Sequence, residues 1–167
     1  DWSNGMKDSP EYVYGLMDAL QGAGIRRFLL PDTLGILNPL QCVEYLRKML
    51  KRYPDTHFDF HAHNDYDLSV SNSLAAVLSG AKGLHVTVNG LGERCGNAPL
   101  ASVQVILKDM FHAHTNIHEE MLNDVSRLVE GYSGIAVAPN TPVVGRYVFT
   151  QVAGVHADGD NKDNLYC

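Results

Sequence analysis

An alternation of strand and helix is the feature that most limits the fold of this 167-residue chain. Apolar, strand-like segments begin near residues 25, 57 and 83, and a helical pattern follows each of them. The spacing is about 30 residues, which is the length of one βα unit. Strands that alternate with helices pair in parallel. The sequence therefore predicts an α/β fold built on a parallel sheet.

The hydrophobic periodicity and the Pro and Gly positions give bounds for each element. The predicted strands cover residues 25–30, 57–61 and 84–88. The predicted helices cover residues 9–23, 39–50, 68–78, 98–111 and 117–129. Clear periodicity is lost after residue 138, and we expect an extended or looping segment there.

Three or four βα units are too few to close a (β/α)₈ barrel, which needs about 250 residues. The chain is either a smaller open sheet or part of a larger barrel. It begins at Asp1 and ends at Cys167 without a tail at either end. We expect a fragment of a longer protein.

Composition excludes several classes of protein. The net charge of −6 argues against a protein that coats nucleic acid. No apolar run approaches the ~18 residues that a membrane span needs, and residues 1–5 lack the pattern of a signal peptide. Cys42, Cys95 and Cys167 are far apart and form no C-x-x-C pair. They predict free thiols in a reducing compartment, and hence a cytoplasmic protein. The charge and the lack of a long apolar run predict that it has no nucleic-acid or membrane partner.

Polar residues gather after each predicted strand, in the segments 31–35, 61–65 and 89–97. These are the carboxyl ends of the strands. Ligands and catalytic groups lie on that side of barrels and of open parallel sheets. Three clusters in register predict a functional site there.

His61 and His63 are the sharpest signal in these clusters. Residues i and i+2 of a strand point to the same side, so the two imidazoles can share one metal ion. The alternative is a pair of partly buried histidines with local hydrogen bonds. Asn64 and Asp65 favour the metal, because a metal-bound histidine needs an acceptor for its other ring nitrogen.

A second H-x-H sequence, His112 and His114, serves as an internal comparison. It falls at the end of a predicted helix, where residues i and i+2 lie about 200° apart and cannot readily share a metal. We expect these two histidines, with His118, to be surface residues.

The other polar groups leave alternatives open. The glycine-rich segment 89–97 is a phosphate cradle, a tight turn, or a flexible loop that brings Asn97 to the metal. Thr33 either donates a hydrogen bond to a substrate carboxylate or caps the approach to a helix. Asp32 either binds a metal or accepts hydrogen bonds from the adjacent backbone. His156 and Tyr166 lie in a polar tail typical of a solvated loop. Their residue types alone do not indicate a catalytic role.

Several of these motifs resemble one known family. The chain pairs HAHND, from His61, with NGLGERCGN, from Asn89, and also has LPDTLGILNP and TPVVGRYVFTQVAGVHADGDNKDNLY. Together they resemble the 2-isopropylmalate, homocitrate and citramalate synthases. These belong to the DRE-TIM metallolyases, which include hydroxymethylglutaryl-CoA lyase. The opening DWSNGMKDSPEYV is most similar to the citramalate branch.

The resemblance implies a TIM barrel, of which residues 1–138 are the later part and residues 139–167 the end and the start of a linker. It implies that His61 and His63 bind a divalent metal and that Asn97 is a further ligand or near-ligand. Two imidazoles with oxygen ligands suit Zn²⁺ or Mn²⁺, with Mg²⁺ a further option.

The resemblance also implies roles for residues outside the metal site. Thr33 is expected to hold the substrate carboxylate. His156 and Tyr166 match linker residues that support the chemistry, in some members across the interface of a homodimer.

The implied reaction is an acyl transfer in branched-chain amino-acid biosynthesis. Acetyl-CoA condenses with a 2-oxo acid and CoA is released. Pyruvate, giving (R)-citramalate, is the first expectation, and 2-oxoisovalerate, as in 2-isopropylmalate synthase, is the second. The alternatives are a catalytically silent partner subunit and the lyase reaction. The linker-like segment around His156 disfavours the lyase.

The chain also departs from the family pattern. The aspartate and arginine of the D-R-E motif and the catalytic glutamate have no counterpart in it. We therefore expect no turnover from this chain alone. His85 stands where an acidic residue is common.

Overall fold

The computed structural model describes residues 1–150, and it contains a three-stranded parallel sheet in the order β1-β2-β3. The strands are β1 (Arg27–Asp32), β2 (His57–Ala62) and β3 (Gly83–His85). The helices are α1 (Trp2–Asp8), α2 (Pro10–Gly22), α3 (Pro39–Arg52), α4 (Ser69–Ser79), α5 (Leu100–Asp109) and α6 (Leu122–Ser133). Two 3₁₀ turns, η1 (Val88–Gly90) and η2 (Glu119–Met121), complete the list.

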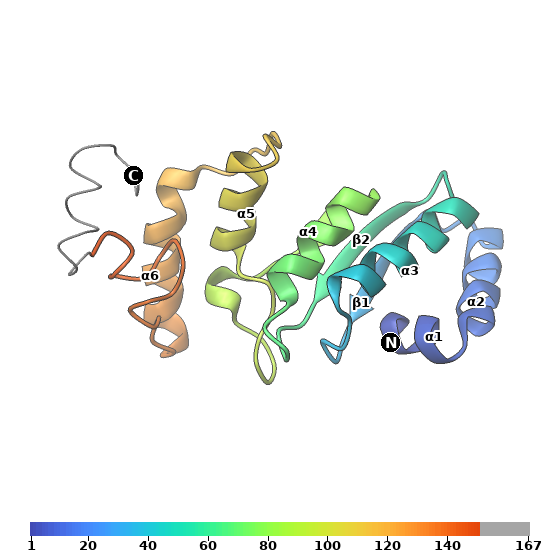
Figure 1. The fold of residues 1–167 in the computed structure, drawn as a ribbon, viewed down its shortest axis with the longest axis horizontal. Coiled ribbons are helices and arrows are strands. Elements are labelled where there is room, and N and C mark those ends of the chain that lie inside the picture. The colour runs from blue at the N-terminus through green and yellow to red at the C-terminus, as the bar shows by residue number, and fades with distance from the viewer. Residues whose placement is uncertain (151–167) are drawn as a thin grey trace.

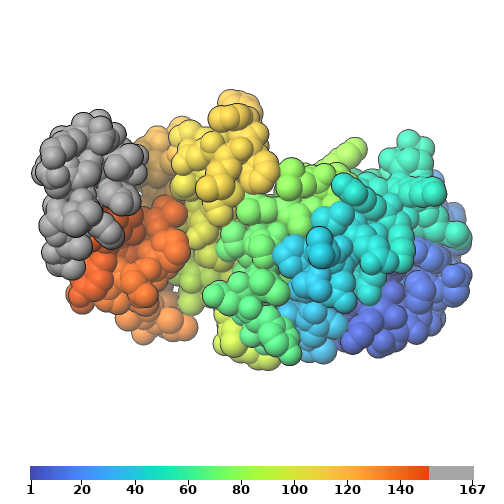
Figure 2. Space-filling view, in the orientation of Figure 1, coloured from blue at the N-terminus to red at the C-terminus, as the bar shows by residue number. Residues whose placement is uncertain are grey.

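The chain runs through the molecule in sequence order. Figure 1 shows α1 to α4 with the sheet on one side, and α5 and α6 side by side on the other. The space-filling view has the same elongated form, with the colours following one another from end to end (Figure 2). Most packing is therefore between elements that are near neighbours in the sequence.

The main core lies between one face of the sheet and the helices α3 and α4. Phe58, Phe60 and Ala62 alternate along β2 and are fully buried on that face. Leu46 and Met49 of α3 pack into the same cluster. Residues at odd positions of β2 must then lie on the opposite face of the sheet, because side chains alternate along a strand.

Cys42 of α3 is part of this core. Its thiol donates to the carbonyl of Asn72 at 3.4 Å. Burial, and then the nearby Asp32 carboxylate, raises the pKa of the Cys42 thiol to about 12. Cys95 is exposed, and neither cysteine is in a disulfide, as the sequence predicts for this part of the chain.

The predicted alternation of strands and helices is correct, but the third strand is shorter than predicted. The predicted strand 84–88 ends at His85, because the chain turns into η1. Thr87 keeps only an isolated bridge to Pro99. The predicted helix 98–111 begins at Leu100, since Pro99 is extended and precedes the first helical residue.

Two further differences concern helices. The hydrophobic pattern does not predict α1, because a seven-residue helix shows too little periodicity; buried Trp2 and Met6 hold it against the core. The predicted helix 117–129 is divided between η2 and α6, and α6 continues to Ser133. Residues 134–150 contain no helix or strand, which agrees with the predicted loss of periodicity after residue 138. Within residues 1–150, no helix is long and apolar enough to cross a membrane.

Candidate metal centre

His61 and His63 lie together at the carboxyl end of β2. His61 is in the strand, and His63 follows its last residue. Their ring centroids are 4.9 Å apart, with the ring planes at 83°. His63 is only 8% exposed, whereas His61 is half-buried. The i, i+2 spacing thus places the two rings side by side, as the strand periodicity predicts.

Each of the two imidazole rings has a nitrogen without a hydrogen-bond partner in the described part of the chain. The Nδ1 atoms of both histidines are buried and have no hydrogen-bond partner among residues 1–150. Buried polar atoms without a partner are rare and costly. The alternative of two locally hydrogen-bonded histidines therefore lacks the bonds it requires at these atoms.

The prediction that Asn64 and Asp65 orient the histidines is wrong for this geometry. The Asn64 side-chain oxygen accepts from the amide and hydroxyl of Ser69, at 3.1 and 2.6 Å, and so serves the start of α4. The Asp65 carboxylate binds Arg94 instead. Both residues lie beside the site in the sequence, but their hydrogen bonds support the surrounding loops.

The glycine-rich segment is a folded turn that delivers Asn97 to His63. The two residues form an antiparallel bridge, and the Asn64 amide donates to the Gly96 carbonyl at 3.0 Å. The side-chain nitrogen of Asn97 donates to the Leu91 carbonyl at 2.9 Å. The side-chain oxygen of Asn97 is buried without a partner in the described residues. The structure therefore realises the tight-turn alternative, and this turn places Asn97 beside His63.

The phosphate-cradle alternative fits the segment poorly. The backbone N–H groups of Gly90, Leu91, Gly96 and Asn97 all donate to backbone carbonyls within residues 87–93. A cradle needs such groups free to point at the ligand. These four donors are already used.

Asp32 closes a turn after β1. Its carboxylate is fully buried and accepts from the backbone amides of Ile36, at 3.1 Å, and Leu37, at 3.2 Å. The structure thus favours the backbone role over the metal role that the sequence also allowed.

Thr33 lies next to this turn and beside the histidines. The His63 amide donates to the Asp32 carbonyl, at 3.3 Å, so the parallel register brings position 33 alongside position 63. The Thr33 amide donates to Asp1 at 3.3 Å, and its carbonyl accepts from Arg94 at 2.6 Å.

His85, at the end of β3, also lies beside the candidate ligands, which the sequence does not predict. It is the register partner of His61 on β3, and the two ring centroids are 5.9 Å apart. Burial lowers the pKa of His61, and electrostatic interaction with the neighbouring His63 and His85 rings lowers it further. A neutral imidazole is the form that binds metal. The pairing of strands, which one sequence does not reveal, was the missing signal.

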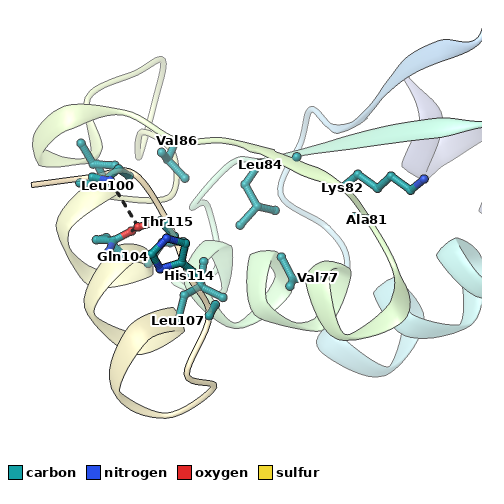
Figure 3. A pocket seen from close by; sticks show the side chains of 14 residues that line it. Val77, Ala81, Lys82, Leu84, Val86, Leu100, Gln104, Leu107, His114 and Thr115 are labelled. Carbon is teal, nitrogen blue, oxygen red and sulfur yellow. Dashed lines mark hydrogen bonds between the residues drawn. The ribbon is translucent and has the colours of Figure 1, made fainter.

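The second histidine pair lies elsewhere. The sequence predicts His112 and His114 at the end of a helix, but this is wrong, because α5 ends at Asp109. Both are exposed, as is His118. His114 lies on a mainly apolar cavity of about 310 Å³ between α4, β3 and α5, near the hydrogen bond of Thr115 to Gln104 (Figure 3). The cavity lining contains neither His61 nor His63.

The donor atoms of the site fit a divalent metal. Two imidazoles and one amide oxygen suit Zn²⁺ or Mn²⁺. Among residues 1–150, no group of three or more His, Cys, Asp or Glu side chains is placed to hold a metal. A metal here would need further ligands beyond these side chains. His156 and Tyr166, the predicted catalytic pair, lie outside the described residues.

The fold and the site together define a parallel α/β protein with a candidate metal centre at the carboxyl edge of its sheet. Comparison with known proteins gives the family: the chain belongs to the HMGL-like family, whose model matches residues 3–129. This is the DRE-TIM family that the HAHND and NGLGERCGN motifs resemble, so the sequence-based assignment is confirmed.

Three curated relatives show the similarity. A "Putative (R)-citramalate synthase" of Methanopyrus kandleri is 40% identical over 96% of this chain and 32% of its own. The homocitrate synthase of Sulfolobus acidocaldarius is 43% identical over 92% of this chain and 32% of its own. A "Probable 2-isopropylmalate synthase" of Methanosarcina mazei is 40% identical over 92% of this chain and 30% of its own. The chain thus spans about a third of the length of these relatives.

Solved structures confirm the predicted fold class. The HMG-CoA lyase of Bacillus subtilis superimposes with a TM-score of 0.69 and 28% identity, over 76% of this chain and 44% of that one. An HMG-CoA lyase of Acinetobacter baumannii, solved with coenzyme A and 3-methylmalate, gives a TM-score of 0.66 at 28% identity, over 75% of this chain and 43% of that one. The described residues therefore correspond to part of an HMGL-like TIM barrel.

Proposed function

We propose that this chain supplies the metal-binding half of a barrel that condenses acetyl-CoA with a 2-oxo acid. One observation carries the proposal: the imidazoles of His61 and His63 lie side by side, the backbone of Asn97 bridges to that of His63, and the buried Nδ1 atoms and the Asn97 side-chain oxygen have no hydrogen-bond partner among residues 1–150. The similarity to three kinds of synthase supports the reaction class. In this proposal residues 1–138 are the later part of the barrel and residues 139–167 lead into a linker.

A divalent metal held by His61, His63 and Asn97 would act as a Lewis acid toward the keto group of the 2-oxo acid. The chain's own groups prepare the site for it. Burial lowers the pKa of His61, which favours the neutral imidazole, and the turn before Asn97 holds its backbone against that of His63. Thr33, brought alongside His63 by the strand register, is proposed to hold the substrate carboxylate through its hydroxyl.

The linker is proposed to complete the site. His156 would hold and transfer a proton during the condensation, with Tyr166 in support, in a homodimer whose linkers contact the other subunit. The substrate that we propose first is pyruvate, with (R)-citramalate as product and a place in isoleucine synthesis. 2-Oxoisovalerate, the substrate of leucine synthesis, is the second.

The test is release of free thiol from acetyl-CoA by a longer polypeptide that also carries the first half of the barrel. It would be assayed with Mn²⁺ or Zn²⁺ and with pyruvate, 2-oxoisovalerate or 2-oxoglutarate. We expect thiol release with one acid only, pyruvate first. No release with any acid, from a folded and metal-loaded protein, would contradict the proposal and favour the silent partner subunit or the lyase, which cleavage of hydroxymethylglutaryl-CoA would distinguish.

A further inference from the structure

Arg94 joins the three loops that surround the candidate metal centre. Its Nε and Nη2 donate to the two oxygens of Asp65, at 2.8 and 3.0 Å, and Nη2 also donates to the Thr33 carbonyl at 2.6 Å. Thr33 follows β1, Asp65 follows β2, and Arg94 belongs to the loop after β3. One guanidinium group thus connects segments that are 29 and 61 residues away from it in the sequence.

The connected residues are close neighbours of the candidate ligands. Asp65 is the second residue after His63, and Arg94 precedes Asn97 by three residues. Between these two contacts, the Asn64 amide bonds to Gly96, and His63 bridges to Asn97. The ion pair therefore closes a ring of contacts in which both His63 and Asn97 are held.

The geometry distinguishes this ion pair from an ordinary surface salt bridge, which contributes little. It is a two-pronged arginine–carboxylate pair, the arrangement that fixes direction as well as distance. The Asp65 side chain is 20% exposed and the Arg94 side chain 38%. The chain also leaves room for the pair: a Cβ on Gly35 would lie 2.9 Å from an Asp65 carboxylate oxygen.

The backbone of Arg94 points to the same conclusion. Its φ is +55°, in the left-handed region that residues with side chains rarely adopt. Such a conformation persists when surrounding contacts hold it, and it is found at ligand sites. Two sets of contacts hold it here: the turn in which the Gly96 amide donates to the Glu93 carbonyl at 2.9 Å, and the three hydrogen bonds of the guanidinium group.

We infer that Arg94 is a positioning residue: its bonds to Asp65 and Thr33 hold His63 and Asn97 in the arrangement that binds metal. The inference rests on the proposed function for the metal itself. The loop arrangement does not depend on the metal and can be measured without it.

The experiment compares the 167-residue chain with its Arg94→Gln and Arg94→Lys variants. Co²⁺ is titrated in and its visible absorption gives the dissociation constant. Groups that orient metal ligands change affinity by roughly 10- to 100-fold, and we expect a loss in this range for Arg94→Gln. Lysine keeps the charge without the two-pronged geometry, so Arg94→Lys should recover only part of the affinity.

A matched control exists on α6. Arg127 also donates to a carboxylate and a carbonyl, those of Glu130 and Val144, both at 2.9 Å. Arg127→Gln removes a similar bridge away from the site, so it should leave Co²⁺ affinity unchanged. Equal losses in the variants of Arg94 and Arg127 would reduce Arg94 to a general stabilising role and overturn the inference.

Hydrogen exchange of the Asn64 and Asn97 amides, measured without metal, separates this inference from the proposed function. We expect faster exchange of both amides in Arg94→Gln and no change in Arg127→Gln. If the wild-type chain binds no Co²⁺, the proposed function fails at its metal, and the exchange rates still decide the role of Arg94. Unchanged exchange, or unchanged Co²⁺ affinity in a chain that binds Co²⁺, would overturn the inference.

Discussion

At the scale of single residues, the site depends on positions that carry no chemistry of their own. Gly96 has φ of +83°, and a Cβ there would overlap the Gly90 carbonyl oxygen. That carbonyl accepts the Asn97 amide at 3.0 Å. The turn can therefore close, and present Asn97 to His63, only with glycine at position 96.

We predict that Gly96→Ala destabilises the chain by about 1–3 kcal/mol, because the left-handed conformation and the overlap both oppose alanine. It should also weaken Co²⁺ binding, since Asn97 moves. Urea unfolding and Co²⁺ titration measure the two effects. Gly131→Ala is the control: this glycine lies in α6 with open space around its Cα, and alanine there should stabilise by about 0.5–1 kcal/mol. Wild-type Co²⁺ affinity in Gly96→Ala would contradict this account of the turn.

At the scale of elements, α3 shows how one helix supports the sheet from behind. It begins with a reciprocal cap, in which the Asn38 side chain accepts from the Gln41 amide at 2.9 Å and the Gln41 side chain accepts from the Asn38 amide at 3.1 Å. Its apolar face, which includes Leu46, packs on the sheet face opposite the histidines. The helix therefore sets the position of β2 without touching the site.

We predict that Leu46→Ala costs about 2–5 kcal/mol of unfolding free energy, because the side chain is fully buried and leaves a cavity. The control is Leu40→Ala on the same helix, where the side chain is 82% exposed; its effect should lie within about 0.5 kcal/mol. The midpoints of urea unfolding, at an unchanged slope, give both values. Equal midpoints for the two variants would show that α3 is not packed as described.

The helices and strands could be predicted from the sequence, but several contacts between them could not. The alternation of strands and helices follows from local periodicity, and the i, i+2 rule was enough to place His61 beside His63. The contact of His61 with His85 and that of Arg94 with Asp65 depend on strand register and loop paths. Local patterns do not encode these. For the same reason, sequence proximity wrongly assigned Asn64 and Asp65 to the histidines.

At the scale of the whole molecule, the two faces of the sheet differ. The face with Phe58 and Phe60 is covered by helices, whereas on the other face Leu29 is 43% exposed and His85 is also exposed. In a TIM barrel one face of every strand points into the barrel, where side chains pack in layers. The open face carries the candidate metal centre, and because helices cover the other face, we expect the open face to line the barrel interior.

The central claim is that His61 and His63 together bind one divalent metal ion. The most direct test is to add one equivalent of Zn²⁺ to the ¹⁵N-labelled chain and to follow the ring nitrogens of every histidine by long-range ¹H–¹⁵N NMR. We predict large shifts for His61 and His63 and none for His112, His114 and His118. His63→Ala should abolish the shift of His61, and His114→Ala should leave it intact. Unshifted signals from His61 and His63, or a His61 shift that survives His63→Ala, would contradict the account.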